Sequence, residues 1–263
     1  MQRDPHSHKG ENGKVAIIGG SRWIHGAPLF SALAAEASGV DLLFLLVPPA
    51  HEEVAKSSSL NFQVRTFVRE DFSAKDIDPV LELLASMDSA VIGPGLPRTP
   101  TALSALQDLI ASAPCPLVLD ASALQKETLN NVRGKPVVLT PHLGELERMG
   151  IAPDALAATA RDFGVTILLK GPTDTVFAPD GSTRESAGGN AGLTVGGTGD
   201  ALAGLIAGLM AQGVAPAQAA MQASSILKRA GALLFEEQGF CYTTRDVIEQ
   251  IPSAMRDAGS GAH

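Results

Sequence analysis

The sequence predicts a three-layer α/β/α protein with a mostly parallel central sheet. Apolar runs of strand length alternate with helical patterns along nearly the whole chain, which is typical of a parallel sheet covered by helices on both faces. The 263 residues suffice for one large domain of this kind, and no linker, low-complexity run or internal repeat divides them. We therefore predict a single α/β domain over residues 1–263, with flexible ends at 1–12 and 253–263.

Strands are predicted where a short apolar run stops at a turn-forming residue. Residues 15–18 read Val-Ala-Ile-Ile and enter Gly-Gly-Ser, and residues 42–47 stop at Pro48. Such continuous apolar runs are typical of strands that are buried on both faces. The predicted strands are 15–21, 42–47, 64–68, 89–92, 117–120, 137–140 and 166–171, with a hairpin of 175–178 and 182–185. The segment 50–82 is more polar and has a less distinct pattern.

Helices are predicted where apolar residues recur at three- and four-residue spacing. In residues 26–38, Leu29, Leu33 and Ala37 share one face, and Gly39 follows as a stop. The same spacing marks the later helices. The predicted helices are 26–38, 80–86, 101–111, 155–163, 200–212, 216–236 and 243–251.

Composition and charge exclude several classes of partner. The chain has 20 Lys and Arg against 28 Asp and Glu, a net charge of −8, so neither nucleic acid nor a membrane is expected as a partner. No apolar run reaches the length of a membrane span, and residues 1–13 are too polar for a signal peptide. The two cysteines, Cys115 and Cys241, have neither metal nor disulfide spacing, which favours a reducing, cytoplasmic location.

The most informative stretch is residues 188–200, which hold six glycines in thirteen positions and end on Asp200 before an apolar helix. Glycines let backbone N–H groups approach an anion, and a helix start adds unpaired N–H groups, so together they form a phosphate site. An acid beside a phosphate needs a reason. Asp200 is expected to take a proton from an attacking hydroxyl or to hold a metal. The alternative is a helix cap after a glycine turn, but the density of glycines favours the site.

Other unusual loops also follow strands and should meet at one edge of the sheet, where α/β proteins bind ligands. Lys170 ends a strand beside Gly171 and could meet a phosphate, although a solvated lysine is equally plausible. His142 could hydrogen-bond a ligand or could cap the helix that follows, and its position at a strand end favours the ligand. Glu145 suits the first turn of that helix, where an acid complements the helix dipole.

Two further strand ends carry candidate contacts. Asp120 could contact substrate or a metal-bound water, or could equally be a helix N-cap. Residues 93–95 read Gly-Pro-Gly, which indicates either a close approach of backbone to a ligand or a simple turn. No P-loop motif is present, and residues 19–21 lack the glycine spacing of a dinucleotide fingerprint.

Several of these segments together resemble one known family over almost the full chain. The most specific segment is 189–200, Gly-Asn-x-Gly leading into Gly-Gly-Thr-Gly-Asp. The chain is similar to the ADP- or ATP-dependent NAD(P)H-hydrate dehydratases, which have a ribokinase-like fold. The other matching segments are 8–10 (His-Lys-Gly), 19–21 (Gly-Gly-Ser), 25–28 (His-Gly-Ala-Pro), 93–96 (Gly-Pro-Gly-Leu), 119–121 (Leu-Asp-Ala), 140–145 (Thr-Pro-His-x-Gly-Glu) and 169–171 (Leu-Lys-Gly).

The resemblance implies a lyase that repairs hydrated NADH and NADPH. Asp200 would take the proton of the hydroxyl on the hydrated ring, the hydroxyl would attack the terminal phosphoryl of ADP or ATP, and phosphate would then leave to restore the ring double bond. The resemblance also implies Mg²⁺ as a cofactor, no residue assigned as a metal ligand, and a homotetramer. It assigns substrate contacts to Ala27, Gly95, Pro97, His142 and Asp200. It assigns nucleotide contacts to Lys170, Gly171, Pro172, Thr173, Asp174, Asn190, Gly197, Thr198 and Gly199.

Three positions depart from the family pattern. Gly-Pro-Gly-Leu-Gly ends here on Pro97, which has no N–H. Asp-Ala-Asp-Ala-Leu carries Ser122 in place of its second acid, and Asn-Pro-Gly carries Ala191 in place of proline. Two alternatives therefore stay open: a kinase of the same fold acting on a sugar or vitamin alcohol, and a non-catalytic nucleotide-binding protein. The Thr-Pro-His and Gly-Ala-Pro segments favour the dehydratase, and retention of Asp200 argues against pure binding.

Overall fold

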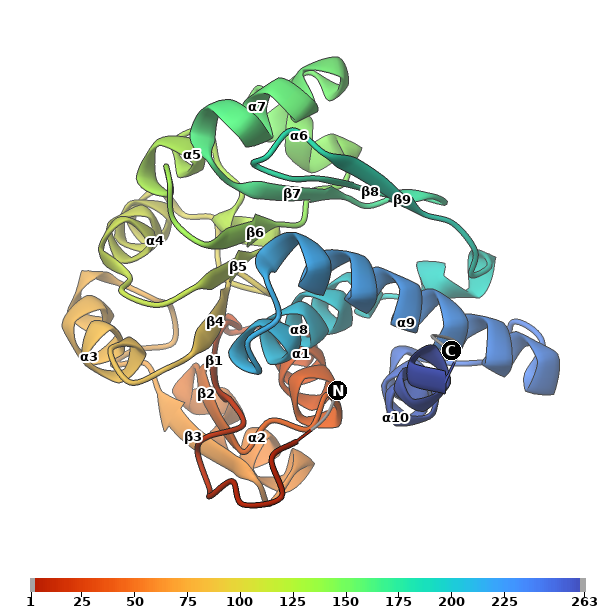
Figure 1. Cartoon of the computed structure of the whole chain (residues 1–263). Coiled ribbons are helices and arrows are strands. Elements are labelled where there is room, and N and C mark those ends of the chain that lie inside the picture. The colour runs from red at the N-terminus through yellow and green to blue at the C-terminus, as the bar shows by residue number, and fades with distance from the viewer. Residues whose placement is uncertain (1–2, 261–263) are drawn as a thin grey trace.

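A nine-stranded sheet forms the centre of the protein in the computed structural model, which describes residues 3–260 and the side chains of 3–256 (Figure 1). Its spatial order is β3-β2-β1-β4-β5-β6-β7-β8-β9. Neighbours from β3 to β7 pair in parallel, and β8 and β9 add an antiparallel hairpin. The strands are β1 (Lys14–Ile18), β2 (Leu42–Val47), β3 (Phe62–Thr66), β4 (Ser89–Ile92), β5 (Leu117–Leu119), β6 (Val137–Leu139), β7 (Thr166–Leu169), β8 (Asp174–Phe177) and β9 (Thr183–Ser186).

Helices cover both faces of this sheet, which confirms the predicted three-layer α/β/α fold. Helices α1, α8, α9 and α10 lie on one side of it, and α3, α4, α6 and α7 lie on the other (Figure 1). The helices are α1 (Gly26–Ala37), α2 (Glu52–Ser58), α3 (Ala74–Leu84), α4 (Pro100–Ser112), α5 (Thr128–Asn131), α6 (Leu143–Met149), α7 (Leu156–Phe163), α8 (Thr198–Ala211), α9 (Pro216–Gln238) and α10 (Thr244–Ser260).

The predicted strands and helices are present, most of them with small shifts of their ends, but α3 begins at Ala74 and not at residue 80. The sequence set no bounds for α6, which was expected only as the helix after His142, and it missed the short helices α2 and α5. The last helix differs most. The sequence ended it at residue 251 and expected a flexible tail from 253, whereas α10 continues through Pro252 to Ser260. Ile251 and Ala254 on either side of the proline are buried in the core, so packing outweighs the helix-breaking effect of proline. Residues 261–263 lie outside the described residues.

Consecutive residues of the central strands supply two separate cores. In β1, Val15 and Ile17 belong to the core that includes α1 and α8, whereas Ala16 and Ile18 belong to the core that includes α3 and α4. Side chains of a strand alternate between the two faces of a sheet, and here both faces are covered. This explains why the central strands read as unbroken apolar runs.

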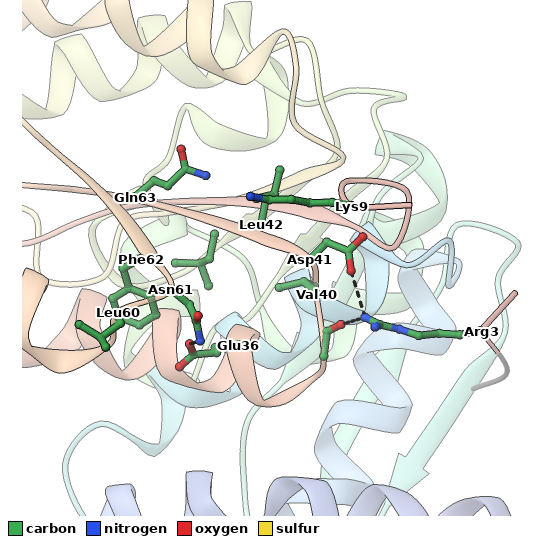
Figure 2. Close-up of a pocket in the computed structure, with 12 residues that line it drawn as sticks. Arg3, Lys9, Glu36, Val40, Asp41, Leu42, Leu60, Asn61, Phe62 and Gln63 are labelled. Carbon is green, nitrogen blue, oxygen red and sulfur yellow. Dashed lines mark hydrogen bonds and ion pairs between the residues drawn. The ribbon is translucent and has the colours of Figure 1, made fainter. Parts of the chain in front are cut away.

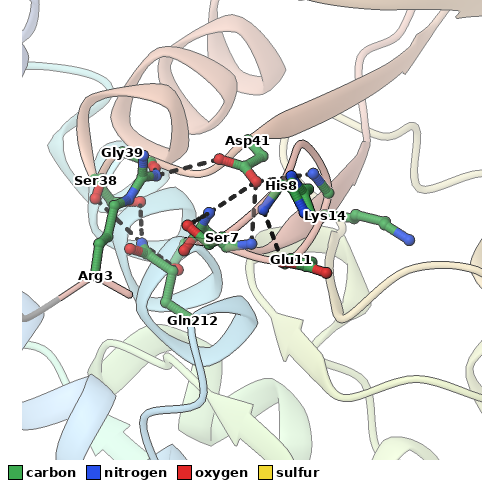
Figure 3. Close-up of polar contacts among 12 residues, drawn as sticks. Arg3, Ser7, His8, Glu11, Lys14, Ser38, Gly39, Asp41 and Gln212 are labelled. Carbon is green, nitrogen blue, oxygen red and sulfur yellow. Dashed lines mark hydrogen bonds and ion pairs between the residues drawn. The ribbon is translucent and has the colours of Figure 1, made fainter. Parts of the chain in front are cut away.

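One carboxylate anchors the amino-terminal segment. Asp41 Oδ2 accepts the backbone N–H groups of Gly10 and Asn12 at 2.8 and 3.0 Å. Arg3 lies 3.4 Å from the other carboxylate oxygen (Figure 3). Burial opposes ionisation of Asp41, but the hydrogen bonds outweigh it and lower the pKa of this carboxyl. The segment 3–12, expected to be flexible, therefore has specific anchors, and the two residues before it lie outside the described part.

The direction in which the sheet grows reverses between β1 and β4. The chain builds β2 and β3 on one side of β1 and then places β4 on the other. The loops after β1 and β4 consequently meet: the N–H of Gly20 donates to the C=O of Pro94 at 2.8 Å, and the N–H of Gly93 donates to Ile18 at 3.2 Å. In α/β proteins such a reversal opens the crevice in which ligands bind, at the carboxyl ends of the strands.

Close packing of α1 on α8 gives a stability prediction. At Gly204 an added Cβ would overlap the backbone C=O of Ser31. We expect Gly204→Ala to lower the free energy of unfolding by about 3 kcal/mol, because the backbone of α1 has to move. Urea denaturation measures the loss. Gly26→Ala is the control, since its Cβ would meet only the Phe30 ring at 3.7 Å; equal losses for the two variants would contradict the prediction.

Candidate functional site

The glycine loop wraps directly into the start of α8. It includes a 3₁₀ turn, η4 (Ala191–Thr194), and the hydroxyl of Thr198 donates to the C=O of Leu193 at 2.8 Å, which ties the helix start to that turn. Gly197 precedes the helix with a φ of 101°, and a Cβ there would overlap the ring of Phe30. Only glycine satisfies both the positive φ and the close approach.

The first turn of α8 presents backbone donors. Its first backbone hydrogen bond joins the N–H of Ala201 to the C=O of Gly197 at 2.9 Å. The N–H groups of residues 198–200 precede it, in the positions that no helix can satisfy internally, and the helix dipole adds positive potential there. Asp200 sits in the same turn, and its C=O accepts the hydroxyl of Ser31 at 2.8 Å. The predicted anion site and the predicted base therefore share one turn of helix.

Lys170 lies among carboxylates at the end of β7. Its Nζ is 2.7 Å from Asp120 Oδ1 and 3.5 Å from Glu145 Oε2. Thr140 donates its hydroxyl to the same Asp120 oxygen at 2.8 Å. A Cβ on Gly199 would lie 3.4 Å from Nζ, so the ammonium also borders the start of α8. The capping alternative for Asp120 is wrong, because its side chain makes no cap hydrogen bond.

These neighbours change the proton affinity of two groups. Burial raises the pKa of Asp200 to about 7, and the charge of Asp120 adds to this, while Lys170 acts in the opposite direction. For Lys170, burial disfavours the charged form, but the carboxylates of Asp120 and Glu145 outweigh it and raise the pKa of the ammonium. Lys170 is therefore held as a cation beside a carboxyl that titrates near neutral pH.

The structure shows that His142 caps a helix, whereas its ligand contact, which the sequence favoured, stays a prediction. Its Nδ1 accepts the N–H of Glu145 at 3.3 Å, and Glu145 accepts the N–H of His142 at 2.9 Å, which makes a capping box for α6. The His142 side chain is 56% exposed and lines the cavity at the start of α8. Glu145, which the sequence assigned only to the first helical turn, is buried and faces Lys170.

Two adjoining cavities occupy this edge of the sheet. One of about 490 Å³ lies at the start of α8, and one of about 510 Å³ shares walls with it at Gly171 and Lys228. Both volumes suit a small-molecule ligand. Most residues to which the sequence assigned nucleotide contacts line them, whereas Thr173 and Gly197 flank the walls. The predicted lining residues are His142, Lys170, Gly171, Pro172, Asp174, Asn190, Thr198 and Gly199.

Lys228 is a site residue that the sequence analysis missed. From α9 its Nζ donates to the C=O of Pro172 at 2.8 Å and lies 3.8 Å from Asp174 Oδ2. The Asp174 carboxylate also accepts the N–H of Gly171 at 2.9 Å and the hydroxyl of Ser224 at 2.6 Å, so it positions the loop after β7. Ser224 and Lys228 stand four residues apart on one helix face. A lysine on an otherwise apolar face is the signal that could have revealed it.

The side chain of Asn190 braces the glycine loop. Its amide donates to the C=O of Gly231 at 2.7 Å, and its oxygen accepts the N–H of Gly192 at 2.8 Å and the hydroxyl of Tyr242 at 2.6 Å. These bonds join the loop to α9 and to the segment before α10. Asn190 also lines the second cavity, and its nucleotide contact stays a prediction.

Three of the five expected substrate-binding residues, Ala27, Gly95 and Pro97, gather at the loops after β1 and β4. His142 follows β6 and lines the cavity at the start of α8, and Asp200 lies in α8 itself. A Cβ on Gly95 would lie 3.3 Å from the Cβ of Ala27, so the two residues are neighbours. Pro97 is half-buried two residues further along the same loop. This group lies on the β1 and β4 side of Asp200, and the cavities with Lys170 and Lys228 lie on the β7 side.

The two sequence departures at Pro97 and Ser122 lie next to each other in space, because Ser122 bonds the carbonyl that precedes Pro97. The hydroxyl of Ser122 donates to the C=O of Leu96 at 2.7 Å, and Arg98 Nε donates to Ser122 at 3.3 Å. A hydroxyl can donate to this carbonyl, whereas an ionised carboxylate would repel it. Pro97 in turn has no N–H that could donate a hydrogen bond to a carboxylate at position 122. The two departures therefore fit each other.

A separate cavity of about 590 Å³ lies at the opposite edge of the sheet, against the amino ends of β2 and β3 (Figure 2). Three of its four charged residues, Arg3, Glu36 and Asp41, are engaged with neighbours. Glu36 accepts the hydroxyl of Ser59 at 2.6 Å and the amide of Asn61 at 2.7 Å, and Arg3 pairs with Asp41. This cavity lies at the amino ends of the strands and contains none of the predicted site residues.

Within residues 3–260, no three histidine, cysteine or carboxylate side chains are placed to hold a metal ion together. No helix in the described part of the chain combines the length and the apolar character that crossing a membrane requires.

The sheet order and the glycine loop before α8 place the protein in the ribokinase-like class of α/β proteins. The fold is similar to that of a ribokinase-like superfamily protein from Enterococcus faecalis V583, with 26% identity, a TM-score of 0.83, and coverage of 97% of this chain and 91% of that chain. It is also similar to the ADP/ATP-dependent NAD(P)H-hydrate dehydratase from Bacillus subtilis, co-crystallised with ATP and Mg²⁺, at 27% identity and a TM-score of 0.81 over 97% of this chain and 93% of that chain.

The family model described as NAD(P)H-hydrate dehydratase matches residues 15–253. The chain is 37% identical over 261 residues to the ADP-dependent (S)-NAD(P)H-hydrate dehydratase of Cenarchaeum symbiosum, covering 95% of this chain and 91% of that protein. It spans about half the length of the bifunctional repair enzymes that it also matches. The chain belongs to the NAD(P)H-hydrate dehydratase family.

The raised pKa of Asp200 predicts a pH-dependent stability. Asp200 has a pKa of about 7 in the folded protein against 3.8 for the ordinary side chain, so the folded state binds more protons between these values and stability falls as pH rises from about 4 to 7. We expect Asp200→Asn to raise the melting temperature at pH 8 by on the order of 5 °C, and by much less at pH 4. Differential scanning calorimetry at both pH values measures this. The exposed Asp108→Asn is the control; an equal gain at both pH values for Asp200→Asn would contradict the prediction.

Proposed function

We propose that this protein dehydrates hydrated NADH and NADPH, with ADP or ATP as phosphoryl donor, and so repairs damaged nicotinamide nucleotides as a lyase. The observation that carries the proposal is the position of Asp200. Its carboxyl, with a pKa of about 7, lies in a helix turn that offers backbone N–H groups beside the cation of Lys170. A base that titrates near the working pH is suited to proton abstraction. The names of the relatives support the choice of substrate.

The proposed reaction joins a phosphoryl transfer to an elimination. The ring hydroxyl attacks the terminal phosphorus of the donor, its proton passes to Asp200, and the bond from phosphorus to the leaving nucleotide breaks. The carbon–oxygen bond to the new phosphate group then breaks, a proton leaves the neighbouring ring carbon, and the double bond returns. The N–H groups at residues 197–199 and the ammonium of Lys170 supply positive potential where charge develops on the phosphoryl group.

Mg²⁺ fits this arrangement as the companion of the donor phosphates. It prefers carboxylate and phosphate oxygens and keeps several waters. Asp120 and Glu145, whose carboxylates flank Lys170, are the residues that would hold it. When bound it would neutralise phosphate charge. The Bacillus subtilis relative was co-crystallised with ATP and Mg²⁺, which supports the assignment.

A kinase for a sugar or vitamin alcohol is the second candidate. The observation in its favour is that Pro97 and Ser122 depart from the family pattern. Both lie at the loop beside Gly95, on the expected substrate side, where Ser122 bonds the C=O of Leu96. Asp200 and the glycine loop serve both reactions equally. The two candidates differ in the fate of the phosphorylated product, because only the dehydratase expels phosphate.

The proposal extends to assembly and location. We propose a homotetramer, as the family resemblance implies. Cys115 and Cys241 are both free thiols, which fits a reducing cytoplasm. The proposed partners are hydrated NADH or NADPH and ADP or ATP.

Recovery of absorbance at about 340 nm, the wavelength that marks a reduced nicotinamide, tests the proposal. We expect purified protein with Mg²⁺ and hydrated NADH to restore this absorbance with ADP or with ATP, and running both donors decides which one is used. Asp200→Asn should reduce the rate by at least about 100-fold while leaving nucleotide affinity near normal, because it removes the base. No recovery with either donor would refute the dehydratase. Formation of a stable phosphorylated alcohol would favour the kinase.

The pH dependence of kcat/KM tests the environment of Asp200. The base must be ionised, so kcat/KM should fall as pH drops through about 7. Burial and the charge of Asp120 raise the pKa of Asp200, so Asp120→Asn should lower the rate and also move the midpoint to lower pH. Steady-state kinetics between pH 5 and 9 measure both effects. A midpoint that stays in place or rises in Asp120→Asn would contradict the assignment of Asp200 as the base.

A further inference from the structure

A short hairpin at the edge of the expected substrate side carries the only tryptophan of the sequence. Ser21 and Ile24 exchange two backbone hydrogen bonds, at 3.1 and 2.9 Å, and the turn between them presents Arg22 and Trp23. The Trp23 side chain is 83% exposed, and the guanidinium of Arg22 lies 5.2 Å from the centre of its ring. A large aromatic ring is seldom left in solvent without a binding role.

The hairpin is held in place. His51 Nε2 lies 2.8 Å from the C=O of Ser21, and the ring of His51 lies 5.5 Å from that of His25, at the other end of the hairpin. At its base the N–H of Gly20 donates to the C=O of Pro94 at 2.8 Å. Trp23 is therefore displayed by an anchored turn, so little ordering cost remains when a ligand binds.

The hairpin adjoins the residues that are expected to bind substrate. A Cβ on Gly95 would lie 2.9 Å from a methyl group of Ile24 and 3.3 Å from Ala27. Ser31, five residues into α1, bonds the backbone of Asp200. Five helical residues span about 7.5 Å and three extended ones at most about 10 Å. Trp23 thus lies within about 18 Å of Ser31, whose hydroxyl bonds the chain that holds Asp200 at 2.8 Å. An extended dinucleotide can span this distance.

We propose that Trp23 and Arg22 bind the adenylate half of the hydrated dinucleotide. The adenine stacks on the indole ring, and the guanidinium faces a phosphate of the same half. A cation exposed beside an aromatic ring suits an anionic nucleotide, notably in a chain with a net charge of −8. The identity of the ligand rests on the proposed function, since the dinucleotide is its substrate.

The phosphoryl donor also contains adenine, but it belongs elsewhere. The cavities that hold Lys170 and Lys228 are lined by the loops after β6 and β7, the glycine loop, the start of α8 and α9. The hairpin follows β1 and touches the loop after β4. Three strand spacings, about 14 Å, separate β4 from β7 in the sheet. ADP bound near Lys228 therefore leaves Trp23 free for the other nucleotide.

Tryptophan fluorescence tests the proposal without turnover, because Trp23 is the only emitter of its kind. Titration with hydrated NADPH should quench the emission with saturation, whereas ADP and hydrated nicotinamide mononucleotide, which lacks the adenylate half, should not. Free N-acetyltryptophanamide at equal absorbance corrects for light absorbed by the ligand. Saturable quenching by ADP alone, or none by the dinucleotide, would overturn the proposal.

Kinetics provide the second test. Trp23→Ala should raise KM for the hydrated dinucleotide about tenfold, the equivalent of about 1.4 kcal/mol, and leave kcat and the KM for ADP unchanged. Trp23→Phe should recover most of the loss, and the mononucleotide should show no difference between variants. Leu60→Ala is the control. It removes a fully exposed side chain at the amino end of β3, whereas the hairpin lies at the carboxyl end of β1.

The outcomes separate this proposal from the proposed function. Saturable quenching without recovery of absorbance would keep the binding site and refute the dehydratase. Recovery of absorbance with an unchanged KM in Trp23→Ala would keep the dehydratase and refute the binding site. A changed oligomeric state of Trp23→Ala in gel filtration, with an unchanged KM, would assign the ring to a subunit contact and also overturn the proposal.

Discussion

The site depends on the buried ammonium of Lys170. It lies 2.7 Å from Asp120 and 3.5 Å from Glu145 and borders the start of α8. Each of these groups comes from a different loop, so the cation joins the ends of β5, β6 and β7 to the glycine loop. Without the cation, buried carboxylates at this edge would repel one another and Asp200 would be still harder to ionise.

The position of Asp200 follows from the close packing of α1 and α8. The overlap that a Cβ would cause at Gly204 or Gly197 shows that glycine lets α8 approach α1. The hydroxyl of Ser31 then holds the backbone of Asp200 at 2.8 Å. Because the hairpin with Trp23 leads directly into α1, this helix links the proposed base to the proposed adenylate site.

The departures at Pro97 and Ser122 raised doubt about the substrate when only the sequence was considered. In the structure they meet through the C=O of Leu96, to which Ser122 donates at 2.7 Å. A serine satisfies a carbonyl next to a proline that has no N–H to give. The two departures thus change hydrogen bonding only near Leu96, where a serine hydroxyl stands in place of a carboxylate. Asp200, Lys170 and Asp120 remain close together.

The sequence by itself determined the layers of the fold and the position of the glycine loop, because strand runs, helical spacing and glycine content are local properties of the chain. It also singled out Asp200 as the proposed base. Tertiary structure decided the rest. Lys228 and Ser224 come from α9, 50 to 56 residues from the partners that they bond. A lysine on an apolar helix face marks Lys228 as unusual, but no local pattern identifies its distant partner. The same holds for Glu145, which reads as a helix-start acid and becomes a partner of Lys170 only when β6 and β7 pair. Packing likewise carried α10 through Pro252, since burial on both sides of the proline outweighs the local preference.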